Sequence, residues 1–452
     1  MKVAKIRSNN LISNSLRLDA SLYLGEGIQL LSLLNSSLIK TKPLQDVTSN
    51  IFYGGRSRRI YVTNPKNGIP FIKGADITKS NFSSLKLISR KRTKDLQSYA
   101  LKEGWTLITR SGSVGNTAFV NKDFIGKAAS DDIIRVCPQD ILDGFLYAYL
   151  SSKYGNILLT QNQYGAVIQH IEPEHIANIP VPIFPETKQQ EIHNLIVESA
   201  NLRVEANRLL EEAVEYFERQ IDKSSFAFNF QTKALKINER NLFSNRLDAQ
   251  FAIGQDEMKK ERKDIEYLPI RNFASNIYVG NRAKRNYVEN GIPFLSSSDM
   301  MLFNPIRYAK QISKKSSNLS GLQVSKGDIL ISRSGTVGNT VLIGDVLSGS
   351  AISEHALRLV IDKNEIAPEY VYCYLNTQQG KRLMECSAYG SVIITLNEDY
   401  VGNILLPILK KEEMNQIIEK VSKFSEKIDD ATFKETQAIH LVEQEISLWQ
   451  QS

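Results

Sequence analysis

The sequence predicts an α+β protein in which two pseudo-symmetric, strand-rich α/β domains are combined with two long helices. Three observations lead to this prediction: an internal duplication, short β-prone segments in each half, and an apolar stripe with helical spacing after each half. Residues 110–117 read RSGSVGNT and residues 333–340 read RSGTVGNT, so one turn occurs twice with a single letter changed. Two copies of one domain are the simplest explanation of this repeat.

The duplication extends well beyond this turn. NIFYGGRSRRIYV at 50–62 returns as NIYVGNRAKRNYV at 276–288, and GIPF at 68–71 returns at 291–294. The pair Tyr164-Gly165 likewise returns as Tyr389-Gly390. With only two long copies, the pattern indicates a duplicated domain and not a solenoid of short repeats.

Each half contains short strand-like segments and brief helical ones. The β-prone runs WTLIT (105–109) and DILIS (328–332) are bounded by Gly, Asn and Ser, which is typical of strands that end in turns. FLYAYLSSKYG and YVYCYLNTQQG have a helical pattern. We therefore predict two mixed domains, at residues 1–187 and 244–411.

A long helix is predicted after each domain. Residues 188 to 222 contain no Pro or Gly, and small or apolar residues recur at alternating spacings of three and four: Ile192, Leu195, Ser199, Leu202, Ala206, Leu209, Ala213 and Tyr216. The second half repeats the spacing, with Glu435 as a charged interruption, at Met414, Ile417, Val421, Phe424, Ile428, Ala431, Ala438 and Val442. We expect coiled-coil helices over 188–222 and 412–452 that pack on each other, with a linker at 223–243.

The totals of the 452-residue chain are those of an ordinary globular protein, with 42% hydrophobic and 23% charged residues. No apolar run reaches membrane-spanning length and the N-terminus has no apolar signal core, so we expect no membrane contact and a cytoplasmic location. The three cysteines form no CxxC pair, which favours reduced structural thiols over a metal site. A net charge of +7 is a mild indication of a polyanionic partner.

The doubled RSG turn has two interpretations. It is either a tight hairpin turn, or a loop whose glycines let Arg110, Ser111, Arg333 and Ser334 approach a DNA backbone. It lacks the Lys-Ser/Thr ending of a nucleotide-binding phosphate loop. The residues alone leave both interpretations open.

Catalytic and metal-binding interpretations find little support. Asn64-Pro65 and Asn304-Pro305 do not continue into the Asn-Pro-Pro-aromatic loop expected of an adenine methyltransferase. Asp131-Asp132 aligns with Glu354-His355, so an acid or metal position is not kept, and a solvated strand end is the simpler explanation. His170 aligns with Thr395, which argues against a catalytic histidine. We expect no catalytic residue and no metal ligand in this chain.

Basic residues cluster at equivalent places in the two copies. Each cluster lies in a Gly-containing loop that leads to a tyrosine: Arg56, Arg58, Arg59 and Tyr61 in the first copy, and Arg282, Lys284, Arg285 and Tyr287 in the second. A single charged run is usually a solvated surface, but two equivalent clusters suggest one surface used twice. Such loops can hold phosphates and can offer Arg to guanine. Together with Tyr164 and Tyr389, they are the predicted DNA-binding residues.

The pattern resembles the specificity subunits of type I restriction-modification systems. The resemblance rests on GWTLITRSGSVGNT and YGAVIQHIEPEHIANIPVPIF in the first half, on GDILISRSGTVGNT and YGSVIITLNEDYVGNILLPIL in the second, and on a long helix after each copy. It covers essentially the entire chain. The last helix lacks the usual Pro-Leu-Pro run before its start, and this leaves the first residue of that helix open.

The resemblance implies a non-catalytic subunit whose two target recognition domains each read one half of a bipartite, asymmetric site in double-stranded DNA. The helices would form an antiparallel spacer that docks two modification (methyltransferase) subunits. S-adenosylmethionine would be bound by those subunits, this chain needing no cofactor, and restriction subunits could join. The residues expected on the spacer and docking helices are Ile192, Leu195, Leu202, Leu209, Ile417, Val421, Phe424 and Ile428.

Two alternatives stay open at this point. The chain could be a scaffold that binds only protein through its coiled coil, with the basic loops serving solubility. It could instead be the recognition subunit of a related system whose partner fuses methylation and cleavage in one chain. Strong salt dependence of DNA binding would favour DNA recognition over the scaffold, and the neighbouring genes would separate the two recognition systems.

Overall fold

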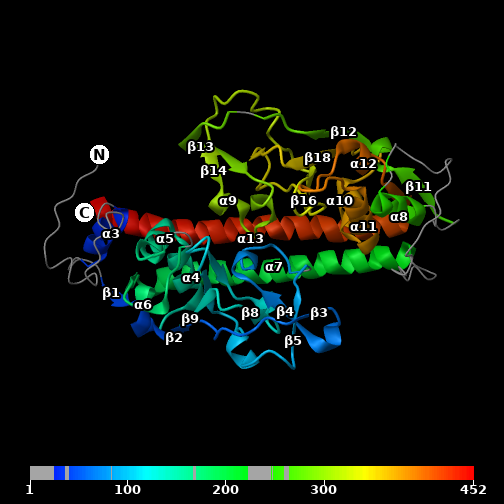
Figure 1. Cartoon of the computed structure of the whole chain (residues 1–452). Helices are drawn as coiled ribbons and strands as arrows, with labels where there is room; N and C mark the ends of the chain where they lie inside the picture. The colour runs from blue at the N-terminus through cyan, green and yellow to red at the C-terminus, as the bar shows by residue number, and fades with distance from the viewer. Residues whose placement is uncertain are drawn as a thin grey trace. The chain divides into compact units, whose positions relative to one another are not determined.

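The computed structural model describes residues 25–35, 40–82, 84–165, 169–221, 246, 248–258, 264–282 and 284–451. The chain divides into two compact units, one formed by Met1–Val204 with Ala431–Ser452 and the other by Glu205–Asp430. Each of the two long helices in Figure 1, α7 (Glu186–Ile221) and α13 (Lys411–Gln451), contributes a segment to both units.

The first unit contains two four-stranded sheets and a strand pair. The first sheet has the order β2 (Thr48–Phe52), β9 (Ile133–Pro138), β6 (Thr106–Thr109), β7 (Thr117–Phe119). The second sheet has the order β3 (Tyr61–Val62), β5 (Leu87–Ser89), β4 (Gly68–Ile72), β8 (Ala128–Ala129). The strand pair is β1 (Thr41–Pro43) with β10 (Pro180–Pro182). The α-helices among the described residues of this unit, besides the segments of α7 and α13, are α3 (Glu26–Leu34), α4 (Asp143–Ser151), α5 (Lys153–Gln161) and α6 (Pro173–Ile176).

The second unit repeats this topology. Its main sheet has the order β12 (Ala274–Val279), β18 (Ala356–Ile361), β15 (Ile329–Ser332), β16 (Thr340–Leu342). The other sheets are β14 (Lys310–Ile312), β13 (Tyr287–Leu295), β17 (Ala351–Ile352), and the pair β11 (Glu266–Pro269) with β19 (Leu405–Ile408). Its helices include α8 (Ala249–Met258), α9 (Pro305–Tyr308), α10 (Pro368–Asn376), α11 (Gln378–Ser387) and α12 (Glu398–Gly402).

One difference between the sheets follows from an insertion. In the first unit, the short turn Pro65–Asn67 separates β3 from β4, and both strands pair with β5. In the second unit the single strand β13 takes both places beside β14, with an irregularity between Tyr287 and Ile292. The two units therefore share a framework but present differently shaped loops at this edge.

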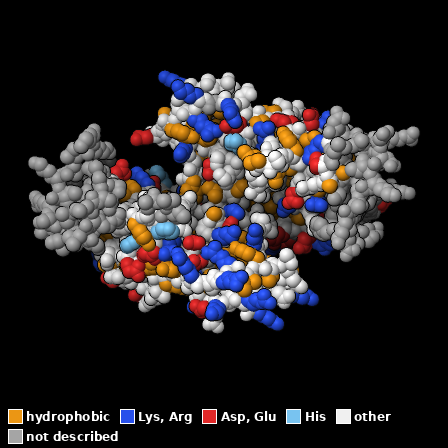
Figure 2. All heavy atoms as spheres, viewed as in Figure 1, with side chains coloured by type: hydrophobic (Ala, Val, Ile, Leu, Met, Phe, Trp, Pro, Cys, Tyr) orange, Lys and Arg blue, Asp and Glu red, His pale blue; other side chains and the backbone are white. Residues whose placement is uncertain are grey.

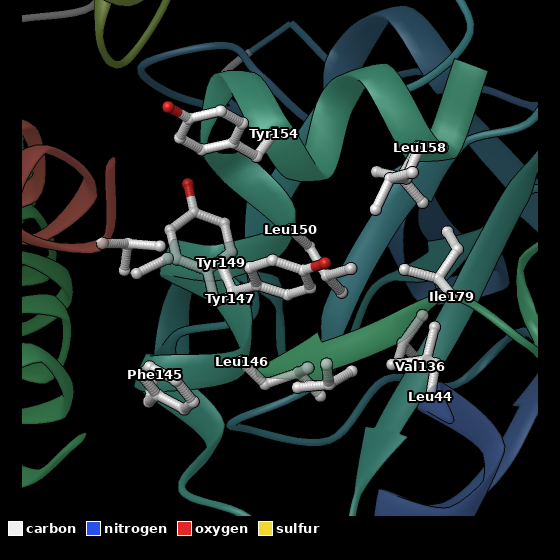
Figure 3. Close-up of a cluster of buried hydrophobic side chains, with 14 of the residues drawn as sticks. Leu44, Val136, Phe145, Leu146, Tyr147, Tyr149, Leu150, Tyr154, Leu158 and Ile179 are labelled. Atoms are coloured by element: carbon white, nitrogen blue, oxygen red, sulfur yellow. The ribbon is translucent and has the colours of Figure 1, made fainter. Parts of the chain in front are cut away.

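The strands and helices form where burial demands them. All four residues of β6 and of β15 are buried, which explains their continuous apolar and β-branched character. The helix α4 is buried on nearly every side, because it packs on β6 and β7 while its other residues contact the long helices. Figure 3 shows its side chains Phe145, Leu146, Tyr147 and Leu150 converging with residues of α5 and β9.

Glycine fixes the tight corner that follows this helix. Gly155, near the start of α5, lies directly against the backbone carbonyl of Tyr149, where no Cβ could be placed. Gly380 meets the carbonyl of Tyr374 in the same way in the second unit. The corner is capped by Ser152 in the first unit and by Thr377 in the second, each accepting a hydrogen bond from the glycine N–H.

The long helices pair in antiparallel fashion within each unit. In the first unit Ser199 Oγ donates to the carbonyl of Ala431 (2.6 Å) and Lys434 pairs with Glu198 (3.1 Å). In the second unit Lys420 pairs with Glu212 (2.6 Å) and Lys427 with Glu205 (2.9 Å). Residue numbers rise on one helix as they fall on the other, so the predicted fold of two strand-rich α/β domains and two antiparallel helices is confirmed.

The buried face of α7 is wider than the predicted stripe. Ile192, Ala206 and Ala213 are buried as expected, but Leu195 and Leu202 are only half-buried, and Ile196 and Phe217 are buried instead of their predicted neighbours. The reason is that α7 packs against α13 and also against the strand-rich part of each unit. A stripe of two positions per heptad is therefore too narrow to describe its buried face.

Within the described residues, no helix combines the length and the apolar character needed to cross a lipid bilayer. The predicted linker at 223–243 lies outside the described residues. The helix α13 begins at Lys411, shortly after the end of the strand β19 at Ile408. This gives the first residue of the last helix, which the sequence did not determine. The predicted domain boundaries as such stay predictions.

Candidate functional site

In the first unit, the loop between β2 and β3 presents the predicted arginines to solvent. Arg59 is anchored at its base by Asp131 (2.6 Å) and Asp132 (3.3 Å), while the largely exposed Arg56 lies 3.5 Å from Asp131. Partial burial works to lower the pKa of Arg59, but hydrogen bonds and attraction from the two aspartates outweigh it and raise the pKa. Arg58 is exposed. The loop is thus a cationic surface with a fixed base.

The second unit builds the same arrangement with different residues. Arg285 pairs with Glu354 at 2.8 Å, and the exposed Arg282 lies 3.8 Å from the same carboxylate. Burial works to raise the pKa of Glu354, but a backbone hydrogen bond and Arg285 lower it below its usual range. Lys284 is exposed. We call Arg282, Lys284 and Arg285 the second cationic cluster, and Arg56, Arg58 and Arg59 the first.

Aromatic rings accompany both clusters. The Arg59 guanidinium lies 5.4 Å from the centre of the Phe71 ring, and Arg285 lies 4.8 Å from that of Phe294. The predicted tyrosines are exposed and each carries a lysine over its ring: Lys86 at 5.7 Å over Tyr61, and Lys310 at 5.2 Å over Tyr287. These matched contacts extend each cluster along the neighbouring strands. Figure 2 shows Lys and Arg side chains gathered over the region of β3, β4 and β5.

The carboxylates that pair with the two cationic clusters correct the expectation that Asp131 is a solvated strand end. Asp131 is buried and ion-paired, so it is not the solvated strand end that the sequence suggested. The partner loop is far away in sequence, and only the fold brings it beside β9. The sequence did contain a signal for this ion pair, because both copies of the basic loop are accompanied by an acidic residue at the same position, Asp131 in the first copy and Glu354 in the second.

The doubled RSG turn is a tight turn that uses its own N–H groups. Gly115 and Gly338 have φ of +86°, a left-handed conformation that favours glycine, and their N–H groups bind Thr109 O (3.1 Å) and Ser332 O (3.0 Å). Gly112 N–H donates to Gln169 O and Gly335 N–H to Ile394 O, both at 3.3 Å. The turn therefore supports the segment that follows Tyr164 or Tyr389, and these N–H groups are not available to hold an anion.

The two arginines of this turn differ between the units. Arg110 is buried, makes a two-point ion pair with Glu172 (Nε–Oε2 3.2 Å), and lies 4.3 Å from the centre of the Tyr53 ring. Burial works to lower its pKa, but the pairing with Glu172 raises it. Arg333 is half-buried and donates through Nε to Leu396 O (3.3 Å), and Asn397 stands where Glu172 stands in the first unit.

This geometry argues against the predicted DNA contact of Arg110, because its guanidinium is buried and occupied by a carboxylate. Arg333 is less enclosed. The serines next to them are half-buried and bind residues at the base of the clusters: Ser111 donates to Asp132 (3.0 Å), and Ser334 lies 3.2 Å from His355 Nδ1. The turn is thereby linked to the cationic loop in each unit.

The remaining predicted surface residues are the tyrosines of the doubled Tyr-Gly pair. Tyr164 and Tyr389 are exposed to nearly the same extent, 42% and 41%. Tyr164 donates its hydroxyl to Glu172 (2.7 Å). Tyr389 lies near the Arg246 guanidinium (5.9 Å) and edge-on to Tyr400 (6.2 Å). Each tyrosine is joined to the RSG turn of its unit, Tyr164 and Ser111 through His170, and Tyr389 and Ser334 through Thr395.

Half of the predicted helix residues lie inside the units. Ile192, Leu209, Ile417 and Val421 are buried, whereas Leu195, Leu202, Phe424 and Ile428 are half-buried. The buried members hold α7 and α13 in their units and cannot themselves touch a partner. Exposed apolar side chains on α13 are instead Phe433 and Leu448.

No metal site is evident in the part of the chain that the structure describes, where no three His, Cys, Asp or Glu side chains come together. The cysteines Cys137, Cys373 and Cys386 are all buried. Burial raises the pKa of the Cys137 thiol to about 11, so this thiol is protonated and unreactive near neutral pH.

Sequence comparison places this geometry in a known context. The family model of the type I restriction modification DNA specificity domain matches residues 39–213. Among solved structures, the chain is similar to the S subunit of a type I restriction-modification system from M. genitalium, with 14% identity, coverage of 91% of this chain and 96% of that chain, and a TM-score of 0.39. The HsdS subunit from Thermoanaerobacter tengcongensis matches with the same identity and coverage and a TM-score of 0.27.

The matched residues include the first cationic cluster, the first RSG turn and the first part of α7, and the second unit repeats that architecture. The resemblance inferred from the doubled motifs is confirmed by this match. Residues 39–213 of the chain thus carry a type I restriction modification DNA specificity domain.

Proposed function

We propose that this chain is the non-catalytic specificity subunit that reads a bipartite, asymmetric DNA site and directs methyltransferase subunits to it. The observation that carries the proposal is the repetition of the fold. The first unit contains a matched DNA specificity domain, and the second unit has the same strand order with a cationic cluster at the equivalent loop. One chain thus offers two surfaces for two segments of DNA.

The asymmetry of the site follows from differences between these surfaces. Asp132 and Lys73 of the first unit are replaced by His355 and Ser296 in the second, and the turn Pro65–Asn67 has no counterpart inside β13. Base readout depends on side chains that reach the major-groove edges and on their geometry. Two surfaces with different side chains and loop shapes therefore read two different half-sites.

The partners follow from the same proposal. Two modification subunits, each binding S-adenosylmethionine, would be docked by the segments of α7 and α13, and restriction subunits could join the complex. A pseudo-symmetric chain can hold a symmetric pair of partners while it reads an asymmetric site. The chain itself would bind no cofactor.

The proposal is tested by producing the chain together with its modification subunit in a host that lacks methylation and by mapping the methylated motifs. The expected result is a split motif with two unlike halves. A palindromic motif would contradict the asymmetry, and salt-independent self-association without DNA binding would favour a protein scaffold. Turnover of S-adenosylmethionine by the purified chain alone would contradict its non-catalytic role. If one partner chain carries out both methylation and cleavage, this chain is the recognition subunit of the related system in which the two activities are fused.

A further inference from the structure

Among the described residues, a short loop of the second unit carries the two most exposed large apolar side chains, Val392 and Ile393. Val392, Ile393 and Ile394 are 93%, 66% and 49% exposed, and the exposed ring of Tyr389 stands at the start of the same loop. Three consecutive β-branched apolar side chains in water are unfavourable for a protein that binds nothing there. We call residues 389–395 the apolar loop.

The apolar loop stands on a well-defined base. The N–H and carbonyl groups of Tyr389 and Thr395 bind each other reciprocally (2.8 and 2.7 Å), which closes the loop. Gly390, with φ of +111°, makes the bend, and Gly335 of the RSG turn donates to Ile394 O. The doubled RSG turn thus holds up a loop whose tip projects apolar side chains.

The apolar loop adjoins the second cationic cluster through a chain of contacts. Thr395 bridges to Ser334, Ser334 lies 3.2 Å from His355, and His355 follows Glu354, which pairs with Arg285 and Arg282. An apolar tip beside a cationic surface is complementary to duplex DNA, in which apolar side chains enter a groove while basic ones meet the phosphates.

We propose that the apolar loop inserts into a groove of the duplex and strengthens binding without reading the sequence. This inference rests on the proposed function, since it takes DNA as the ligand of the second cationic cluster. The pair Val-Ile recurs at 167–168 of the first copy, which lies outside the described residues. The two domains read different half-sites, so side chains that they share are expected to contact a feature common to both DNA segments. The groove wall and the base stack are such features.

The physical signature of such a contact differs from that of a phosphate contact. Apolar contacts release no counterions, so their loss lowers affinity while the slope of log K against log salt stays the same. Loss of arginines lowers affinity and also makes that slope shallower. Salt dependence therefore separates the apolar loop from the cationic cluster beside it.

The test uses the full chain in complex with its modification subunit and the variant Val392→Ser/Ile393→Ser/Ile394→Ser. We expect binding to the methylated-motif duplex to weaken by roughly tenfold or more, with the salt slope and the motif unchanged. Ile125→Ser, which removes an apolar side chain of similar exposure from the first unit, is the matched control and should bind like the native chain.

Three outcomes would overturn the inference. Native affinity for DNA together with weakened binding of the modification subunit would make the loop a protein-docking element. A relaxed second half-site would make it a base-reading element. Native behaviour in both respects would leave the loop without this role. If the native complex itself shows no sequence-dependent binding, the proposed function fails, and that failure is seen before any variant is compared.

Discussion

The two units attach the same framework to the long helices by different chemistry. In the first unit, Tyr147 of α4 and Arg203 of α7 both donate to the fully buried carboxylate of Glu435 on α13, Arg203 at 2.6 Å. In the second unit, Tyr372, which corresponds to Tyr147, stacks on Phe424 with ring centres 6.0 Å apart. The charged interruption seen in the sequence is thus a polar junction in one copy and an apolar junction in the other.

This difference shows what a duplicated domain keeps and what it is free to change. The backbone topology and the tyrosine on the central helix are kept, because both units must bury that helix. Arg203 and Glu435 correspond by position to the apolar residues Ile428 and Leu210, and Leu210 packs against the apolar core of the second unit. Loss of one member of a buried ion pair leaves an uncompensated buried charge, whereas loss of one side chain from an apolar junction leaves a cavity.

Substitution of Glu435 is therefore expected to have the largest effect. Glu435→Leu leaves Arg203 and the Tyr147 hydroxyl without this acceptor and should lower the free energy of unfolding by about 3–5 kcal/mol. In Tyr147→Phe/Arg203→Ile/Glu435→Leu, the last two changes introduce the residues of the second unit and the first removes the hydroxyl that has lost its acceptor, so this variant should recover most of the loss. Urea unfolding of the three proteins measures this. If Glu435→Leu is as stable as the native chain, the polar junction does not contribute to the free energy of unfolding.

The cationic clusters give the next largest effect, on DNA binding. Arg56→Ala/Arg58→Ala/Arg59→Ala should weaken binding by about tenfold to a hundredfold at physiological salt and affect only the first half-site. Each lost phosphate contact should make the salt slope shallower by ~0.9, whereas lost base contacts should relax the motif. Titration of duplex DNA at several salt concentrations, with motif mapping, distinguishes these results.

The matched variant in the second unit is Arg282→Ala/Lys284→Ala/Arg285→Ala, which should affect only the second half-site. Because Arg59 and Arg285 also pair with buried or half-buried acids, the thermal unfolding of both variants must be compared with that of the native chain. If neither affinity nor motif changes while the variants stay folded, these loops face away from DNA.

The smallest expected effect concerns a contact of the second unit alone. Asp429 on α13 accepts the backbone N–H groups of Asp345 (2.6 Å) and Val346 (3.2 Å), whereas the first unit attaches its corresponding turn through Asn121 to Ala200 O. Burial raises the pKa of Asp429 above its ordinary 3.8, although the backbone hydrogen bonds oppose this. The side chain therefore titrates at a higher pH in the folded than in the unfolded chain.

The sign of the pH effect follows. A raised folded-state pKa adds stability that is fully present below the unfolded pKa and is lost as the pH rises through the folded pKa. The free energy of unfolding of Asp429→Asn relative to the native chain should thus increase as the pH rises from about 3.8 toward neutrality. Unfolding curves at several pH values measure this difference, and a difference that is constant with pH would contradict it.

Much of the architecture could be predicted because the sequence states it twice. The repeated motifs predict the doubled topology, and the heptad spacing, interrupted only at Glu435, predicts the long helices. The surface position of the two arginine loops could also be predicted, since each leads from a glycine into a tyrosine. Repetition gives what two copies share and says little about contacts that exist in one copy only.

The features that the sequence did not predict are mostly contacts that depend on tertiary packing within one copy. Arg110 is enclosed by Glu172, an acid distant in sequence that becomes Asn397 in the second copy, so the matching RSG motifs suggested equal roles for arginines that are placed differently. The burial of Asp131 depends on a loop that packs over it, and the width of the buried face of α7 depends on the domain packed beside it. Such contacts are set by tertiary structure and leave no periodic pattern.

The central claim is that each unit reads one half-site and that the paired helices set the distance between them. It is tested by inserting four residues after Arg208 in α7 and four after Phe424 in α13, so that the antiparallel pairing is kept on both helices. Each insertion adds about 6 Å and slightly more than one turn, which is one to two base pairs at ~3.4 Å each. Methylated motifs are then mapped for the native and lengthened chains in a host that supplies the modification subunit. The account predicts a longer central gap between unchanged half-sites; an active variant with unchanged spacing, or with new half-site sequences, would contradict it.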